Sequence, residues 1–183
     1  MAQRSQFRDT GHAAFLLLHN IKGLLTKLEE GTYSSQAGLS YPQFLILITI
    51  QASEPPVSET KIAKSIQRNL NTVSMIIDRM EKLRLIDRVR SKTDRRENHI
   101  SLTPLGKEKL TKGIKVGGLL RERLASVFTD EELEQSMDLM GKMRNQILKE
   151  MGREPIPVRS RRPHRERVIE VFRKGLAEAE AKK

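Results

Sequence analysis

Residues 58–103 constrain the fold of this chain more than any other stretch. A short helix is predicted over 58–66, with Ser58 placed to act as its N-cap. A second helix begins near 69–71, and only residues 67–68 separate the two, which leaves room for a tight turn alone. The second helix carries apolar residues at the spacing of one helical face: Val73, Ile76, Ile77, Met80 and Leu83. Two helices joined in this way predict a helix-turn-helix.

The next stretch predicts a β-hairpin. Residues 86–90 and 99–102 alternate in the manner of half-buried strands, and the run 91–98 between them is entirely polar. Val57 is placed to add one extended residue to this hairpin, which would give a three-stranded wing sheet. Thr103-Pro104 then caps a new helix, with proline at the first position. The stretch therefore predicts a winged helix-turn-helix lobe.

Four runs in this order carry a family resemblance: Met80-Glu81-Lys82, Leu85-Ile86-Asp87-Arg88, Asp94-Arg95-Arg96 and Ile100-Ser101-Leu102-Thr103-Pro104-Leu105-Gly106. The chain resembles the MarR family of bacterial and archaeal winged-helix regulators over roughly residues 10–150. One departure is Arg84, where the family usually has glycine and where the backbone often needs positive φ. The resemblance implies a homodimer that binds double-stranded DNA. It also implies a small aromatic or anionic effector that commonly releases the DNA, although no motif identifies the residues of its pocket.

The second helix and the hairpin supply the candidate DNA-binding residues: Asn69, Asn71, Thr72, Ser74, Met75, Arg79, Arg90, Lys92, Asp94, Arg95 and Arg96. Arg96 is expected to enter the minor groove, and Asp94 to hold it. The two residues are spaced so that both side chains can point to one side of an extended wing, where a charge-assisted hydrogen bond would fix the guanidinium. This also resembles the family's Asp-x-Arg wing. The alternative is a solvated hairpin tip, where an exposed ion pair contributes at most about 1 kcal/mol.

Charge also favours a polyanionic partner. Lys and Arg number 34 against 23 Asp and Glu, which gives a formal charge of +11 and a pI near 10.1. The rival hypothesis is a winged-helix module for protein–protein contact, but such a face more often exposes aromatic and aliphatic anchors. Here Arg88 and Arg90 join the cations of 92–96 on the hairpin. We therefore expect a sequence-specific DNA-binding transcriptional regulator, most commonly a repressor in this family.

Catalytic, metal and membrane functions find little support in the sequence. It contains no cysteine, glycine-rich phosphate loop or Gly-x-Ser-x-Gly motif, so neither an enzyme nor a cofactor is expected. His12 and His19 share one side of a helix and could bind a metal with Asp9, but no ligand cluster completes the site and a polar helix rim is favoured. The apolar run 13–18 is too short for a membrane span, and a cytoplasmic protein is expected.

The fold predicted for the whole chain is mainly α with a small antiparallel β wing. Residues 1–151 form the MarR-like domain, with the DNA-binding lobe at about 40–103. The helices at about 10–30 and 103–151 form a dimerisation region, since Ala14, Leu18, Ile21, Leu25 and Leu28 make a heptad seam. A methionine-rich stripe around Met137 and Met140 is expected to be core.

Four segments outside the lobe carry further expectations. Residues 1–9 are expected to be loose and 31–39 to form a loop. The glycines at 113, 117 and 118 indicate either close helix approach or a bend at a pocket, or simply a weak point in a long helix, and the weak point is favoured. Residues 152–183 form a basic Pro/Arg-rich linker with a short helix near 166–181. That tail is expected to act as a basic arm that raises non-specific DNA affinity, and the rival view is that Val168–Leu176 packs on the dimer and stabilises it.

Overall fold

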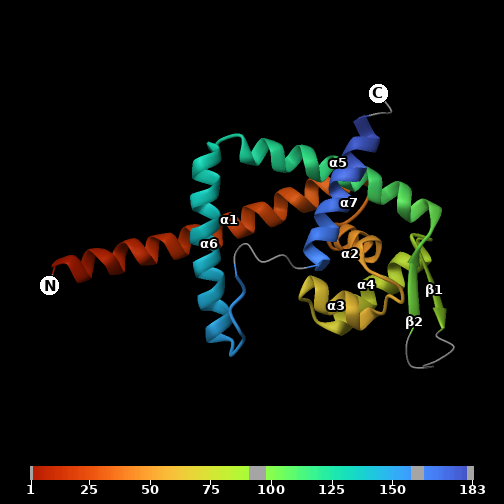
Figure 1. Ribbon diagram of the computed structural model, residues 1–183, viewed down its shortest axis with the longest axis horizontal. Coiled ribbons are helices and arrows are strands. Elements are labelled where there is room, and N and C mark those ends of the chain that lie inside the picture. Colours follow the sequence, from red (N-terminus) through yellow and green to blue (C-terminus); the bar gives the residue numbers. More distant parts are fainter. Residues whose placement is uncertain (1, 91–97, 158–162, 181–183) are drawn as a thin grey trace.

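The computed structural model describes residues 2–90, 98–157 and 163–180 (Figure 1). The elements are α1 (Ala2–Ala37), α2 (Tyr41–Ala52), α3 (Glu59–Ile66), α4 (Leu70–Lys82), β1 (Ile86–Arg90), β2 (Asn98–Leu102), α5 (Pro104–Ala125), α6 (Asp130–Glu150) and α7 (Pro163–Glu180). This confirms a mainly α fold with a small antiparallel wing. Figure 1 shows α2, α3, α4 and the hairpin gathered into one lobe, while the N-terminal part of α1 extends away from it and α6 crosses α1.

Side chains cap the helices, at Ser58 and Thr103 as the sequence predicts and also at Ser40 and Thr129. The Ser40 hydroxyl accepts from the Gln43 amide, and the Gln43 side chain accepts from the Ser40 amide, so the two form a capping box. Ser58 and Thr103 cap α3 and α5 through the hydroxyl alone, which accepts from the Lys61 and Gly106 amides, and Pro104 opens α5. Thr129 begins α6 with a second capping box. These caps satisfy backbone donors that would otherwise lack partners, which fixes where each helix begins.

The core lies around α2, which is the most apolar helix of the lobe. Its Phe44, Ile46 and Leu47 are at most 1% exposed. The other large, fully buried side chains come from the elements around it: Tyr33, Leu39, Ile62, Val73, Ile77, Met80 and Ile86. Each such side chain contributes roughly 1.5–3 kcal/mol by leaving water. The buried side chains of α4, Val73, Ile77 and Met80, are among those that the helical spacing predicts.

The wing sheet is simpler than expected. Within the described residues the sheet has two strands, paired antiparallel from Ile86 opposite Leu102 to Arg90 opposite Asn98. The expected third strand reduces to one hydrogen bond of 2.9 Å, in which the Ile100 amide donates to the Val57 carbonyl. Two consecutive prolines, Pro55 and Pro56, precede Val57 and leave a single residue to reach the sheet.

The end of α4 corrects one prediction and confirms another. Leu83, predicted on the buried face, is 56% exposed because α4 ends at Lys82 and Leu83 is already its C-cap. Arg84 then adopts a φ of +55°, so the position where the family usually has glycine does need positive φ. The Leu85 amide closes the turn by donating to the Met80 carbonyl at 2.9 Å.

The N-terminal helix is longer than predicted. The expected loop over 31–39 is wrong, since α1 continues to Ala37 and ends at Gly38 with φ of +63°. Tyr33 and Ala37 are each 2% exposed, so burial in the lobe outweighs the low helix propensity of the segment around Gly31. Residues 2–9, expected to be loose, belong to the same helix.

The glycines of α5 correct another expectation. A methyl group added to Gly113 would meet the Phe44 ring at 2.5 Å, and one added to Gly117 would meet the Tyr33 hydroxyl. One added to Gly118 would lie 2.7 Å from Leu176. The glycines thus permit close approach of α1, α2 and α7 to α5, and the reading of a weak point in a long helix is wrong.

An extended apolar surface covers α1, α5 and α6. Exposed large side chains include Phe15, Leu16, Leu17, Ile21, Leu24, Leu25, Leu28, Leu119, Leu124, Met137, Leu139, Met140, Met143 and Ile147. The methionine stripe predicted as core is therefore open in the single chain. Exposed apolar side chains gathered on three helices in this number indicate an interaction site. None of the described helices is long and apolar enough to cross a membrane.

Candidate DNA-binding surface

The tight turn between α3 and α4 sets the geometry of the helix-turn-helix. Gln67 closes α3 in the left-handed region at φ of +54°, and the Arg68 amide donates to the Ala63 carbonyl at 3.0 Å. Asn69 then caps α4, its side-chain oxygen accepting from the Asn71 amide at 2.9 Å. Ile62 and Ile77 hold the two helices together at 0% exposure. The cap gives Asn69 a structural role beside the predicted one of DNA contact.

The outward face of α4 carries most of the candidate residues on that helix. Asn71, Thr72, Met75 and Arg79 are exposed. Small polar groups can hydrogen-bond base edges, and apolar groups can contact thymine methyls, in the major groove of DNA. These four side chains are therefore open to solvent on α4, and their contact with DNA stays a prediction.

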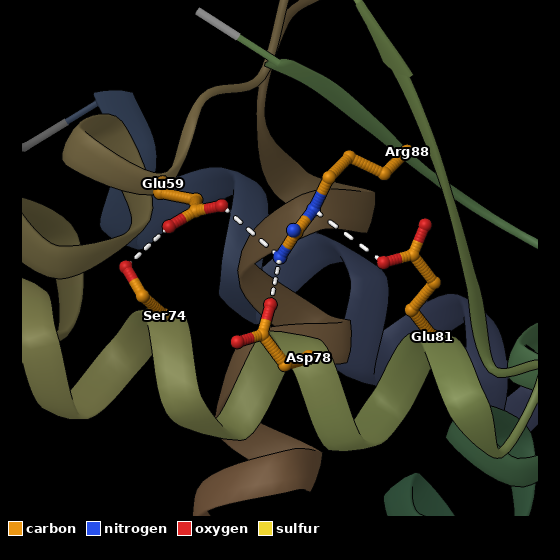
Figure 2. A network of polar contacts seen from close by, with 5 residues as sticks. All are labelled: Glu59, Ser74, Asp78, Glu81 and Arg88. Atoms are coloured by element: carbon orange, nitrogen blue, oxygen red, sulfur yellow. Dashed lines mark hydrogen bonds and ion pairs between the residues drawn. The ribbon is translucent and has the colours of Figure 1, made fainter.

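Arg88 is the centre of a polar network between the wing and both helices. Its guanidinium Nη2 lies 2.7 Å from Asp78 and 3.1 Å from Glu59, while Nε lies 3.7 Å from Glu81 (Figure 2). The second oxygen of Glu59 accepts a hydrogen bond from the Ser74 hydroxyl. One strand residue thus joins β1 to α3 and α4.

Burial and charge act in opposite directions on Arg88. Its side chain is 19% exposed, and burial alone would lower its pKa. The hydrogen bond that Arg88 donates to Asp78 and the charges of Glu59, Glu81 and Asp78 outweigh burial and raise that pKa above its ordinary value. Arg88 is therefore a fixed cation whose charge is already neutralised. Arg88 lies on the hairpin, as the sequence predicts, but its pairing with three carboxylates leaves little of its charge for DNA.

Ser74 also differs from its predicted setting. It is half-buried, and its hydroxyl points to Glu59 rather than outward (Figure 2). Sequence reasoning missed Glu59 and Asp78 as parts of the site, although Asp78 lies one turn after Ser74 on the same helix.

The wing residues are only partly accessible to description. Arg90 is the last residue of β1, but its side chain lies outside the described set. Lys92, Asp94, Arg95 and Arg96 lie outside the described residues altogether. Their roles in DNA contact stay predictions.

A basic groove of about 550 Å³ opens beside the turn of the helix-turn-helix. Three cations line it: Lys64 and Arg68 from the motif itself, and Arg153 from the segment after α6. The same groove contains the N-terminus of α4, where partly unsatisfied backbone amides favour an anion. Sequence reasoning did not single out these cations, since Arg153 is far from the others along the chain.

A second cavity, of about 510 Å³, lies between α1, α5 and α6. Its walls are largely apolar, and its polar groups include Glu29, Tyr33 and Arg121. Burial raises the pKa of Tyr33 to about 12, although Arg121, which donates a hydrogen bond to its hydroxyl, opposes the shift. Burial likewise raises the pKa of Glu29, and a hydrogen bond from Tyr41 partly offsets it. The cavity thus combines apolar walls with one cation, Arg121, and one carboxyl group, Glu29.

The sequence raises the question of metal binding at His12 and His19. Across the described ranges, no group of three or more His, Cys, Asp or Glu side chains could hold a metal ion. His19 contacts Phe15 instead, with ring centroids 4.5 Å apart and a 3.0 Å contact from Nδ1 to the Phe15 carbonyl.

Comparison with known proteins agrees with this geometry. Residues 39–98 match the model of the MarR family. The HTH-type transcriptional regulator MgrA of Staphylococcus aureus is 37% identical over 86 residues, which are 47% of this chain and 58% of MgrA. The uncharacterized regulator YdcH of Bacillus subtilis is 30% identical over 89 residues, 47% of this chain and 60% of YdcH. The match therefore spans little more than half the length of these relatives.

Solved structures share the fold over more of the chain. The MepR–DNA complex of S. aureus has a TM-score of 0.67 at 24% identity, covering 72% of this chain and 96% of MepR. FabT of Streptococcus pneumoniae in complex with DNA has a TM-score of 0.64 at 21% identity, covering 76% of this chain and 98% of FabT. The central region of the chain, residues 39–98, is therefore similar to the MarR family, and the chain shares the fold of these solved structures.

Proposed function

We propose that this protein is a sequence-specific, DNA-binding transcriptional regulator that acts as a homodimer. The observation that carries the proposal is the outward face of α4, where Asn71, Thr72, Met75 and Arg79 are exposed beside a groove lined by three cations. Phosphate contacts position a protein on DNA, and base-edge contacts give specificity, so the surface offers both. Repression is proposed as the mode of action, and the cytoplasm as the place where such a regulator meets DNA.

The neighbours support this proposal by what they bind. MepR and FabT are both described in complex with DNA, and they share the fold of this chain. The rival function, protein–protein contact through the winged helix, would need apolar anchors around α4. Leu70 and Met75 are exposed there, at 43% and 59%, but they stand among polar and basic residues rather than in a patch.

Selection from random duplex DNA tests the proposed function. We expect the wild-type protein to enrich an inverted repeat with half-sites about 10 base pairs apart, since a twofold dimer presents two recognition helices one DNA turn apart. Affinity should fall steeply with salt, each neutralised phosphate adding about −0.9 to the slope of log K against log salt. Enrichment of no sequence, or a slope near zero, would exclude the DNA-binding function.

Dimerisation is expected from the apolar surface of α1, α5 and α6. Leu16, Leu17, Leu24, Leu139 and Met140 are each 56–64% exposed in the single chain, and a self-complementary twofold interface would cover them. Light scattering at micromolar concentration should give twice the chain mass of 20.9 kDa. Leu139→Glu, which places a charge on that surface, should shift the protein to monomer. A monomeric wild type would contradict the expectation.

The cavity between α1, α5 and α6 is the proposed effector site. Its apolar walls suit an aromatic body, and Arg121 suits an anionic group. A small aromatic carboxylate bound there would weaken DNA binding if it favours a different orientation of the lobe. Repeating the DNA selection with benzoate-type compounds tests this part of the proposal.

A further inference from the structure

Helix α7 packs against α2, in the winged-helix lobe, and against α5, which leads out of that lobe. Figure 1 shows it lying across α5 and α2, with the chain reaching it through the segment after α6. Its inner face carries the apolar side chains that contact the core: Val168, Val171, Phe172 and Leu176. The helix α2 is the centre of the DNA-binding lobe, whereas α5 runs from the wing toward the apolar surface described above. α7 therefore bridges the lobe and the proposed dimerisation region.

The fit between α7 and α5 is reciprocal. A methyl group added to Gly118 of α5 would lie 2.7 Å from a Leu176 methyl, and one added to Gly175 of α7 would lie 2.8 Å from a methyl of Ile114. Each helix thus has a glycine where the other has an aliphatic side chain. Glycine in a helix interior costs about 1 kcal/mol relative to alanine, and the close approach of the two helices offsets that cost. Such a fit is expected of a specific docking site rather than of a loose basic arm.

Phe172 joins α7 to the lobe as well as to α5. Its ring lies edge-on to Phe44 of α2, with centroids 5.8 Å apart, and the guanidinium carbon of Arg121 lies 4.0 Å from its centroid. Phe172 thus stands between α2 and α5. Near the start of α7, Arg167 forms an ion pair with Glu54, which lies just after the end of α2.

We propose that α7 fixes the orientation of the DNA-binding lobe relative to α5, and that Phe172 and Leu176 are positioning residues for operator binding. The inference rests on the proposed function of a dimeric DNA-binding regulator. Two recognition helices must meet half-sites about one DNA turn, roughly 34–36 Å, apart. A small rotation of each lobe changes that separation, so a fixed orientation selects one half-site spacing. With α7 undocked, the lobe keeps its own core but samples more orientations, and the spacing preference relaxes.

Variants of the full-length protein change the contact between α7 and α5 from either helix. Phe172→Ala removes the ring between α2 and α5. Gly118→Leu fills the space of Leu176 from the α5 side while improving helix propensity, so α5 itself should not be weakened. Adding Leu176→Ala to Gly118→Leu should restore docking by freeing the occupied volume. The matched control is Ile169→Ala, an apolar truncation at a position of α7 that is 40% exposed and does not contact the core.

Two measurements are made on each variant. Hydrogen exchange of residues 163–180 reports whether α7 is docked. Titration of duplexes whose half-site spacing is changed by one or two base pairs reports the spacing preference. We expect wild type and Ile169→Ala to lose roughly tenfold in affinity, about 1.4 kcal/mol, on an altered spacing. In Phe172→Ala and Gly118→Leu we expect faster exchange of α7 and a several-fold smaller discrimination, restored in the double variant.

Three results would overturn the inference. The first is unchanged exchange of α7 in both Phe172→Ala and Gly118→Leu, which would mean that these contacts do not hold the helix. The second is a released α7 with an unchanged spacing profile, or with an equal loss of affinity at every spacing, because a merely stabilising role gives that result. The third is a wild type that binds no inverted repeat. That result would contradict the proposed function as well as this inference. Hydrogen exchange tells the two failures apart, because α7 would still be docked when only the proposed function is wrong.

Discussion

Replacing Gly106 with alanine is expected to lower the free energy of unfolding by roughly 1–3 kcal/mol, the usual cost of forcing extra volume into a packed site. The same replacement inside most helices raises that free energy by about 1 kcal/mol, so the expected sign is reversed. The reason is the backbone of Leu85, whose carbonyl oxygen occupies the place of the added methyl group and whose carbonyl carbon would lie 3.0 Å from it.

The backbone at Leu85 has little freedom to move away. Its carbonyl accepts a hydrogen bond of 3.2 Å from the Thr103 amide. The Thr103 hydroxyl donates to the Arg84 carbonyl at 2.6 Å and accepts from the Gly106 amide at 2.9 Å. The first turn of α5 is thus fastened to the turn after α4, and a shift of either would break these bonds. This contact accounts for the glycine in the run Leu102–Gly106.

Urea unfolding followed by circular dichroism measures the effect. The control is Gly31→Ala in α1, where an added methyl group meets nothing within 4 Å in the chain. We expect that control to match or exceed wild-type stability. A Gly106→Ala protein as stable as Gly31→Ala would show that the turn can shift without loss, and would contradict the structural reason given for this glycine.

Local signals in the sequence were sufficient to predict the lobe. Ser40, Ser58 and Thr103 act as N-caps because a side-chain oxygen there meets amides of the next turn, an interaction within a few residues. The burial of Val73, Ile77 and Met80 follows from the helical period alone. Segments governed by distant contacts were predicted wrongly. The helix through Gly31 depends on Tyr33 packing against α2 and α5, which composition does not reveal.

In the candidate site, too, local features were predicted and features that depend on distant contacts were not. The outward face of α4 follows from its period, and Asn71, Thr72, Met75 and Arg79 lie there as predicted. The neutralisation of Arg88 did not follow, because it depends on where the register of the hairpin places that side chain. Glu59, its partner on α3, is 29 residues away along the chain. Charge counted along a sequence therefore overestimates the cations available to DNA.

Replacing Arg88 with methionine is expected to weaken operator binding roughly tenfold or more, as like charges facing a partner cost several kcal/mol. Methionine keeps much of the apolar stem but removes the charge, which leaves Glu59, Asp78 and Glu81 uncompensated beside the recognition helix. Stability should also fall, by roughly 1–3 kcal/mol. This is less than the 3–5 kcal/mol of a fully buried pair, because Asp78 and Glu81 are 55% and 43% exposed.

The salt dependence separates this role from direct contact with DNA. If Arg88 contacted a phosphate, Arg88→Met would make the slope of log K against log salt shallower by about 0.9. In that case Asp78→Asn alone would tighten binding, because it would free the guanidinium. If the charge of Arg88 is already neutralised, Arg88→Met should leave the slope unchanged. Adding Asp78→Asn to Arg88→Met should then restore part of the affinity, because it removes one uncompensated carboxylate. Lys82→Met, which removes an equal charge from the exposed end of α4, serves as the control and should leave stability unchanged. A shallower slope in Arg88→Met, with no rescue by Asp78→Asn, would assign Arg88 to the phosphate backbone and end its role as the link between wing and helix.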